Sequence, residues 1–237
     1  GQRGCAWGGS GALWVWAVYT LGFGVVCRAR WGGAEKGSRL GFALTLFWGM
    51  IAYQLVAESV VRAPMLITGN KNYVRKVVFP LEVLPVSAVA CALFHFLVKL
   101  AVLLLAVGLC LQTISIHWIC LPLVVLPAVF MAMGFCWFLA SVGVYLRDVG
   151  QAVTVLVQVL YFLTPVFYPV RRVPAALRPI VMANPLAEVA IDIRRVVVWQ
   201  RWPDWPMWAL MVVVTAVMAQ LGYAWFMKTK RGFADVL

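Results

Sequence analysis

The chain has 237 residues, of which 64% are hydrophobic and 12% are charged, and its net charge is +12. The charged fraction is about half the usual share of soluble domains, which argues against a soluble protein and indicates a polytopic membrane protein. The basic residues lie mainly between apolar runs and predict contacts with anionic lipid head groups or an acidic partner, and no motif indicates nucleic-acid binding.

Six apolar runs predict membrane-spanning helices, because a spanning helix needs roughly 20 mostly apolar residues. We expect an all-α polytopic membrane protein in which residues 1–237 form a single transmembrane domain. The first run is short and rich in glycine, and the chain does not begin with Met, which is compatible with a truncated N-terminus. The predicted spans are about 11–27, 40–61, 83–111, 118–146, 150–168 and 207–227.

The connections between these spans differ in character. Residues 28–39 form a small polar loop, whereas residues 69–80 (GNKNYVRKVVFP) are a basic island between apolar runs. Residues 169–206 are too charged to span a membrane and too apolar for a plain loop. Their short apolar pieces, broken by Pro and Arg, predict re-entrant or interfacial helices.

Six spans place both termini on one side of the membrane, together with the basic island. Excess Lys and Arg usually marks the cytoplasmic side. Lysine and arginine counted together are close to even between the two sides, whereas lysine alone favours cytoplasmic termini. The lysines on the side of the termini are Lys71, Lys76, Lys228 and Lys230, against Lys36 on the other side.

The second and third spans carry polar residues at helical spacing. Gln54, Glu58 and Arg62 follow one another at intervals of four, and His95 and Lys99 form a similar pair. A structural ion pair near a membrane face is the simpler interpretation, and a proton relay is the alternative.

Polar residues recur every three or four positions in the fifth span, which places them on one helical face. Such amides, hydroxyls and phenols suit a conduit for a hydroxyl-rich solute, although interhelical hydrogen bonding uses the same residue types. The residues of this polar stripe are Gln151, Thr154, Gln158, Tyr161, Thr164 and Tyr168. Just before it, Arg147 and Asp148 form a charged helix end at the membrane face.

The sequence offers no catalytic set. It has no phosphate-binding loop, no HExxH motif, and only two distant histidines, His95 and His117. The six cysteines lie mostly in apolar runs and lack CxxC spacing, so we expect buried thiols rather than metal ligands or disulfides. We therefore expect neither an enzyme nor a resident cofactor or metal.

Several stretches together resemble the membrane subunit of type-2 ABC exporters, in the branch that exports polysaccharides such as O-antigen, capsule and teichoic acid. They occur in the order expected for that family and span roughly residues 11–237. One departure is the start GQRGCAWGGSGALW, which lacks the amphipathic helix usual in the family. The matching stretches are ARWGG, GNKNYVRKVVFPLEVLP, YLRDVGQ, TPVFYPV with LRPIVMANPL, and FMKTKRGFADVL.

The resemblance implies a homodimer of six-helix subunits in the bacterial cytoplasmic (inner) membrane, with a separate ATPase subunit that binds ATP and Mg. It places a coupling helix within about 65–80, on the cytoplasmic side, docked into that ATPase. Head-group anchoring is the alternative for this basic segment. The implied contact residues are Asn70, Lys71, Asn72, Tyr73, Arg75 and Lys76.

The resemblance also implies short gate helices on the outer side, between the fifth and sixth spans, where Asn184 and Pro185 match a family motif. The polar stripe would line the path of a polyprenyl-diphosphate-linked polysaccharide. The function implied is export of that glycan, driven by ATP hydrolysis in the partner chain.

Three rival functions have different requirements. A type-2 exporter of a drug or small glycolipid would share the fold without a long conduit, and a proton-coupled transporter would need carboxylates in mid-membrane. An integral membrane glycosyl- or phosphotransferase would need an acidic cluster at one face, whereas the acidic residues are scattered along the sequence. They are Glu35, Glu58, Glu82, Asp148, Glu188, Asp192, Asp204 and Asp235.

Overall fold

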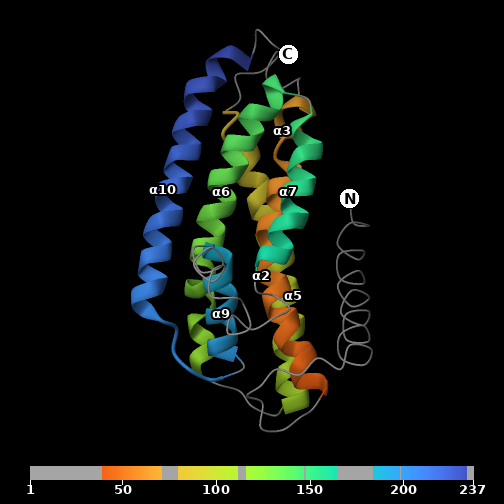
Figure 1. The fold of residues 1–237 in the computed structure, drawn as a ribbon, viewed down its shortest axis with the longest axis vertical. Coiled ribbons are helices and arrows are strands. Elements are labelled where there is room, and N and C mark those ends of the chain that lie inside the picture. The colour runs from red at the N-terminus through yellow and green to blue at the C-terminus, as the bar shows by residue number, and fades with distance from the viewer. Residues whose placement is uncertain are drawn as a thin grey trace.

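The computed structural model describes residues 39–70, 80–111, 116–146, 148–164, 184–197 and 199–233. All regular secondary structure within these ranges is helical, which confirms the predicted all-α class (Figure 1). The elements are α2 (Arg39–Arg62), α3 (Met65–Thr68), α5 (Val83–Leu111), η2 (Ile116–Cys120), α6 (Leu121–Tyr145), α7 (Val149–Leu163), α9 (Pro185–Val197), α10 (Trp205–Thr229) and η4 (Lys230–Gly232).

Three stretches are long and apolar enough to cross a membrane, judged by length and composition. They are Val83–Leu105, Ile116–Tyr145 and Trp205–Gly232, and they correspond to the predicted third, fourth and sixth spans. The predicted second span forms α2, which has 24 residues but is not among these three. The first predicted span lies outside the described residues. The structure thus supports three spans, and the six-span arrangement stays a prediction.

Helix α7 is shorter than the predicted fifth span at 150–168, because it has 15 residues and ends at Leu163. The next residue, Thr164, has extended backbone angles (φ −79°, ψ 130°). Thr164 precedes Pro165 in the sequence, and the ring of a proline disfavours helical angles in the residue before it. Residues 165–183 lie outside the described ranges.

Helices α2, α5, α6, α7 and α10 alternate in direction along the long axis of the molecule (Figure 1). Helices α2, α6 and α10 finish at the end of the molecule where α3 and η4 lie, and we call this the α3 end. Helices α5 and α7 start there, whereas η2 and the start of α10 lie at the opposite end. This topology brings residues 62–70, 80–82, 145–146, 148–149 and 229–233 together at one end.

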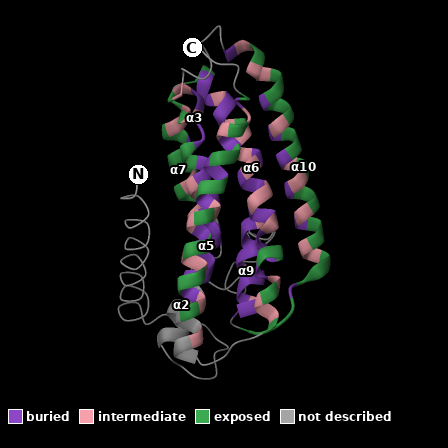
Figure 2. Ribbon diagram, turned by 180° about the vertical axis from the view of Figure 1, so that it is seen from behind, coloured by how far each residue is buried: buried purple, intermediate pink, exposed green. Residues whose placement is uncertain are grey.

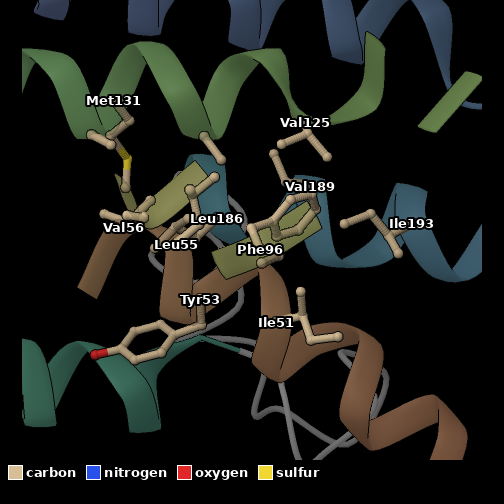
Figure 3. Packing of buried hydrophobic residues seen from close by; sticks show 14 of the residues in the cluster. Ile51, Tyr53, Leu55, Val56, Phe96, Val125, Met131, Leu186, Val189 and Ile193 are labelled. Carbon is tan, nitrogen blue, oxygen red and sulfur yellow. The ribbon is translucent and has the colours of Figure 1, made fainter. Parts of the chain in front are cut away.

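The core lies where α2, α5, α6 and α9 meet, and Figure 2 shows buried residues concentrated on these helices. Trp48 and Leu55 of α2 pack in this core with Val124 of α6 and Ile193 of α9. Figure 3 shows Tyr53 pointing from α2 toward α7. Helix α9 is inserted among the longer helices and is covered on most sides.

Helices α6 and α10 approach backbone to backbone. A Cβ atom at Gly134 would lie 2.8 Å from the Met218 carbonyl oxygen, and one at Gly222 would overlap the Gly134 carbonyl oxygen. Small residues at such crossings allow the close approach that van der Waals packing between membrane helices requires. The pair α6–α10 is therefore the most tightly joined part of the bundle.

A proline inside α6 provides a second link to α10. Pro127 has no N–H to donate to the carbonyl oxygen of Leu123, four residues earlier. The indole Nε1 of Trp208, at the start of α10, donates to that oxygen at 3.0 Å. The neighbouring helix thus satisfies the acceptor that the proline leaves free.

Large apolar side chains cover the outer faces of α5 and α10. Phe94, Leu97 and Leu105 are exposed on α5, and Val213 and Leu221 are exposed on α10. Contiguous exposed apolar surface of this kind is rare on soluble monomers and suits contact with lipid chains. At the end opposite α3, Trp199, Trp202 and Trp205 are exposed, and such rings favour bilayer interfaces.

Candidate functional site

Helix α3 opens the predicted coupling region, which covers residues 65–80. Met65 is exposed, whereas Ile67 is fully buried. The Asn70 side-chain amide donates to the Leu66 carbonyl oxygen at 2.9 Å, so it caps the segment. Of the predicted contact residues only Asn70 is described, and Lys71, Asn72, Tyr73, Arg75 and Lys76 lie outside the described residues.

The predicted charged helix end lies at the same end of the molecule. Asp148 is exposed between Tyr145, which ends α6, and Val149, which starts α7. Its carbonyl oxygen accepts hydrogen bonds from the backbone N–H groups of Gln151 (3.1 Å) and Ala152 (3.3 Å). Asp148 therefore stands at the α7 N-terminus, where a negative charge is favourable. Arg147 lies outside the described residues.

The polar stripe of the fifth span meets two environments. Gln151, Thr154 and Gln158 are exposed on α7, and Tyr161 is half-buried with its ring centroid 4.8 Å from that of Tyr53 on α2. Tyr53 also donates its hydroxyl to the carbonyl oxygen of Val157. The first part of the stripe is therefore available to another molecule, while Tyr161 contributes to the α2–α7 contact. Tyr168 lies outside the described residues.

Thr164 and Asn184 form a joint between the end of α7 and the start of α9. The Asn184 side-chain nitrogen donates to the Thr164 hydroxyl at 3.1 Å, and its side-chain oxygen accepts from the Leu186 backbone N–H at 3.1 Å. Pro185 occupies the first helical position, where its missing N–H costs nothing. Asn184 thus attaches the start of α9 to the end of α7, and Pro185 begins the helix.

Helix α9 carries an ionic cluster that the sequence reading did not anticipate. The Arg195 guanidinium nitrogen lies 3.2 Å from the Asp192 carboxylate, 3.3 Å from that of Asp204 and 4.0 Å from that of Glu188. Three acidic residues interpreted as scattered therefore meet at one place. Glu188, Asp192 and Arg195 are spaced by four and three residues, which places them on one face of a helix. This spacing could have predicted their contacts from the sequence, but not the contact with Asp204.

This cluster is a paired network that is buried at Glu188 and Asp192 and open to solvent at Asp204. Asp192 and Glu188 are buried, and Asp192 also accepts a hydrogen bond from the Asp204 backbone N–H at 3.3 Å. Burial, with smaller contributions from the charges of Asp192 and Asp204, raises the pKa of Glu188 to about 7, and burial also raises that of Asp192. Helix α9 is not among the three candidate spans. No group of metal-binding side chains occurs within the described ranges.

The polar residues of α2 and α5 form one network. The predicted Glu58–Arg62 ion pair is confirmed at 2.8 Å, and His95 Nδ1 lies 2.7 Å from the same carboxylate oxygen. Lys99 donates to the Gln54 side-chain oxygen at 2.8 Å. The two helices run in opposite directions, so residues spaced by four on α2 meet residues spaced by four on α5. Helical spacing predicted that the polar residues of each helix share a face, but not that the two faces meet.

A second group that the sequence did not reveal lies at the α3 end. The C-terminal part of the chain contacts both sides of the predicted coupling region. Lys230 Nζ lies 2.6 Å from Glu82 Oε2, and Trp137 Nε1 donates to the Glu82 carbonyl oxygen at 3.3 Å. The hydrogen bond from Lys230 lowers the pKa of the Glu82 carboxyl, so this carboxylate is ionised at neutral pH. An apolar cluster below this ion pair contains Ile67, Leu81, Ala140, Val144, Phe226 and Phe233.

Comparison with known proteins gives consistent relationships. The model of the ABC-2 type transporter family matches residues 3–190. An O-antigen export system permease protein, RfbA, of Klebsiella pneumoniae is 23% identical over 197 residues, which are 83% of this chain and 76% of the relative. A protein of the same name from Myxococcus xanthus is 28% identical over 182 residues, covering 76% of this chain and 66% of the relative.

Proposed function

The chain belongs to the ABC-2 type transporter family, and we propose that it is the transmembrane subunit of an exporter of O-antigen polysaccharide. The observation that carries this proposal is that the relatives from two bacterial genera are O-antigen export permeases and align over more than three quarters of this chain. The chain is an integral membrane transporter subunit and is not a catalytic enzyme. The resemblance of its basic island, helix end and C-terminal tail to the same branch agrees with this.

A separate ATPase supplies the energy. The sequence contains no phosphate-binding loop, so ATP and Mg bind to the partner chain. The ATPase docks on the α3 end through the coupling region 65–80, where Asn70, Lys71 and Arg75 are among the contact residues. The side chains of Lys71, Arg75 and Lys76 carry positive charge in this region, so we expect an acidic docking surface on the partner.

Two copies of the chain enclose the path of the glycan. Gln151, Thr154 and Gln158 are exposed along α7, and their amide and hydroxyl groups can exchange hydrogen bonds with sugar hydroxyls. Asn184 and Pro185 belong to the outer gate, where α9 joins the end of α7. The substrate is a polysaccharide on a polyprenyl-diphosphate lipid, and the complex works in the bacterial inner membrane with both termini in the cytoplasm.

Affinity purification of the chain from its native membranes tests the proposal. We expect a near-stoichiometric partner that carries a phosphate-binding loop, identified by mass spectrometry. Deletion of the gene should abolish surface O-antigen and leave lipid-linked polysaccharide inside the cell. A chain that remains alone under gentle extraction would contradict the ATPase-coupled mechanism. Transferase activity in the purified chain would instead support the rival membrane enzyme.

Charge reversal in the coupling region tests the docking site. The double variant Arg75→Glu/Lys76→Glu should lose ATPase association and surface polysaccharide, because it places acidic side chains against an acidic partner surface. Lys228→Glu/Arg231→Glu is the matched control, with the same charge change on exposed residues of the same end. Equal export by both variants and the wild type would exclude the proposed contact.

A further inference from the structure

The chain segments just before and just after the predicted coupling region both contact α6. On the side before it, a Cβ atom at Gly143 would overlap the carbonyl oxygen of Pro64, so α6 meets the 63–64 turn backbone to backbone. On the side after it, Trp137 of α6 donates its indole N–H to the Glu82 carbonyl oxygen. Contact with α6 therefore fixes the segment at two points, one before and one after residues 71–79.

The end of α10 and the residues that follow it also contact the segments before and after residues 71–79. Lys230, at the start of η4, lies 2.6 Å from the Glu82 carboxylate, and 148 residues separate the two in sequence. Phe233 is fully buried in the apolar cluster with Ile67 and Leu81, which lie on either side of residues 71–79 in the sequence. The end of α10 thus contacts both flanks.

Aromatic packing joins the end of α10 to the end of α6. The ring of Phe233 makes an edge-to-face contact with Phe226 (centroids 5.6 Å apart) and lies 6.1 Å from the ring of Tyr145. The Tyr145 hydroxyl donates to the Thr229 carbonyl oxygen at 3.1 Å. Because α6 and α10 also meet backbone to backbone at Gly134 and Gly222, the two helices can move as one unit.

We propose that Glu82, Lys230 and Phe233 form a clamp that transmits movement of the coupling region to the α6–α10 pair. The proposal rests on the proposed function and adds positioning residues to it. The chain itself connects the coupling region only to α2 and α5, which precede and follow it. The clamp adds a non-covalent link to α6 and α10, so closure of the ATPase displaces these two helices together with α2 and α5.

The clamp can be weakened without loss of the fold. The side chains of Glu82 and Lys230 are 28% and 29% exposed, and ion pairs with such access to water contribute little to stability. Their geometry is nevertheless specific, because Glu82 is held through both its carboxylate and its carbonyl oxygen. Breaking the pair should therefore affect transmission of movement more than assembly.

A charge-swap experiment tests the clamp. Glu82→Lys and Lys230→Glu are made singly and together, and surface polysaccharide in cells is measured beside ATP hydrolysis by the purified complex. Each single variant should keep the ATPase bound but export about fivefold less glycan per ATP hydrolysed, because a like-charge contact replaces the ion pair. The double variant restores the attraction and should recover most of the coupling.

Two further variants complete the design. Lys228→Glu changes the same charge at an exposed position on the same helix and should retain wild-type coupling. Phe233→Leu keeps apolar volume but removes the ring contacts, and should lower coupling as the single charge variants do. Wild-type coupling in both single charge variants, or a double variant no better than either, would overturn the clamp. A wild-type chain without a bound ATPase would overturn the proposed function instead.

Discussion

At the residue scale, side chains of the same kind serve different purposes along α7. The hydroxyl of Thr154 donates to the Gly150 carbonyl oxygen on an exposed face, whereas the hydroxyl of Thr164 is buried and accepts from Asn184. Thr164 thus makes an interhelical hydrogen bond. This agrees, at this one position, with the alternative interpretation, in which the stripe serves helix packing instead of a conduit. The exposed Gln151 and Gln158 keep their amide groups available for a hydroxyl-rich ligand.

The conduit hypothesis predicts a difference between polar and apolar positions of α7. Gln151→Ala and Gln158→Ala should each slow glycan export several-fold while dimer assembly and ATPase association persist, because they remove exposed amide groups that bond to sugar hydroxyls. Val155→Ala and Leu156→Ala are controls at exposed apolar positions of the same helix. Surface polysaccharide measured in pulse-labelled cells checks this. Equal rates in all four variants would assign the stripe to packing.

The buried carboxyl group of Glu188 predicts a pH dependence of stability. Its pKa rises from an ordinary value of 4.5 to about 7 in the folded chain, mainly because burial disfavours the charged form. The folded state therefore binds the proton more tightly than the unfolded state, and stability falls as pH rises between these values. Asp192, Arg195 and Asp204 are the charged groups that face this carboxyl.

Thermal unfolding in detergent at several pH values between 4.5 and 7 tests this sign. The midpoint should decrease as the pH is raised, and Glu188→Gln should flatten the profile, because glutamine has no proton to lose. Asp148→Asn is the control, since this carboxyl group is exposed. A midpoint that increases with pH, or a slope unchanged by Glu188→Gln, would contradict the assignment.

At the element scale, prolines explain where the helices depart from simple apolar runs. Pro165 ends α7 early, because the residue before a proline avoids helical angles. Pro127, in contrast, is tolerated inside α6, because Trp208 of α10 donates to the carbonyl oxygen that the proline leaves free. The same residue type therefore ends one helix and joins another to its neighbour.

The α6–α10 contact gives a stability prediction with a matched control. Gly222→Ala should destabilise the protein by about 1–3 kcal/mol, because the new methyl group overlaps the Gly134 carbonyl oxygen and forces the helices apart. Gly108→Ala on α5 has no atom within 4 Å of the new Cβ, so it should be neutral or slightly stabilising. Thermal unfolding of both purified variants checks the difference. Equal midpoints would show that α6 and α10 separate without cost.

At the scale of the whole molecule, the alternating long helices place α3 and the end of α10 at one end and η2 at the other. Cysteines introduced into a cysteine-free background can report this arrangement. Met65→Cys and Arg231→Cys should react with a membrane-impermeant maleimide only from the cytoplasmic side, and Ile119→Cys only from the outer side. All three positions are exposed in the structure. Labelling of Met65→Cys and Arg231→Cys from opposite sides would contradict the topology.

The sequence by itself determined the all-α class, the positions of three apolar spans and the family, because apolar runs and local motifs are properties of neighbouring residues. Spacing by four likewise predicted the Glu58–Arg62 pair within one helix. Only the tertiary structure decided that His95 joins this pair, that three carboxylates surround Arg195, and that Lys230 reaches Glu82. The contacts of His95 and Lys230 join residues 37 or more positions apart. The contact of Asp204 with Arg195 depends on the path of the connection between α9 and α10. Helical periodicity shows which residues share one face of a helix. Which neighbouring helix packs against that face is decided only by the packing of whole helices.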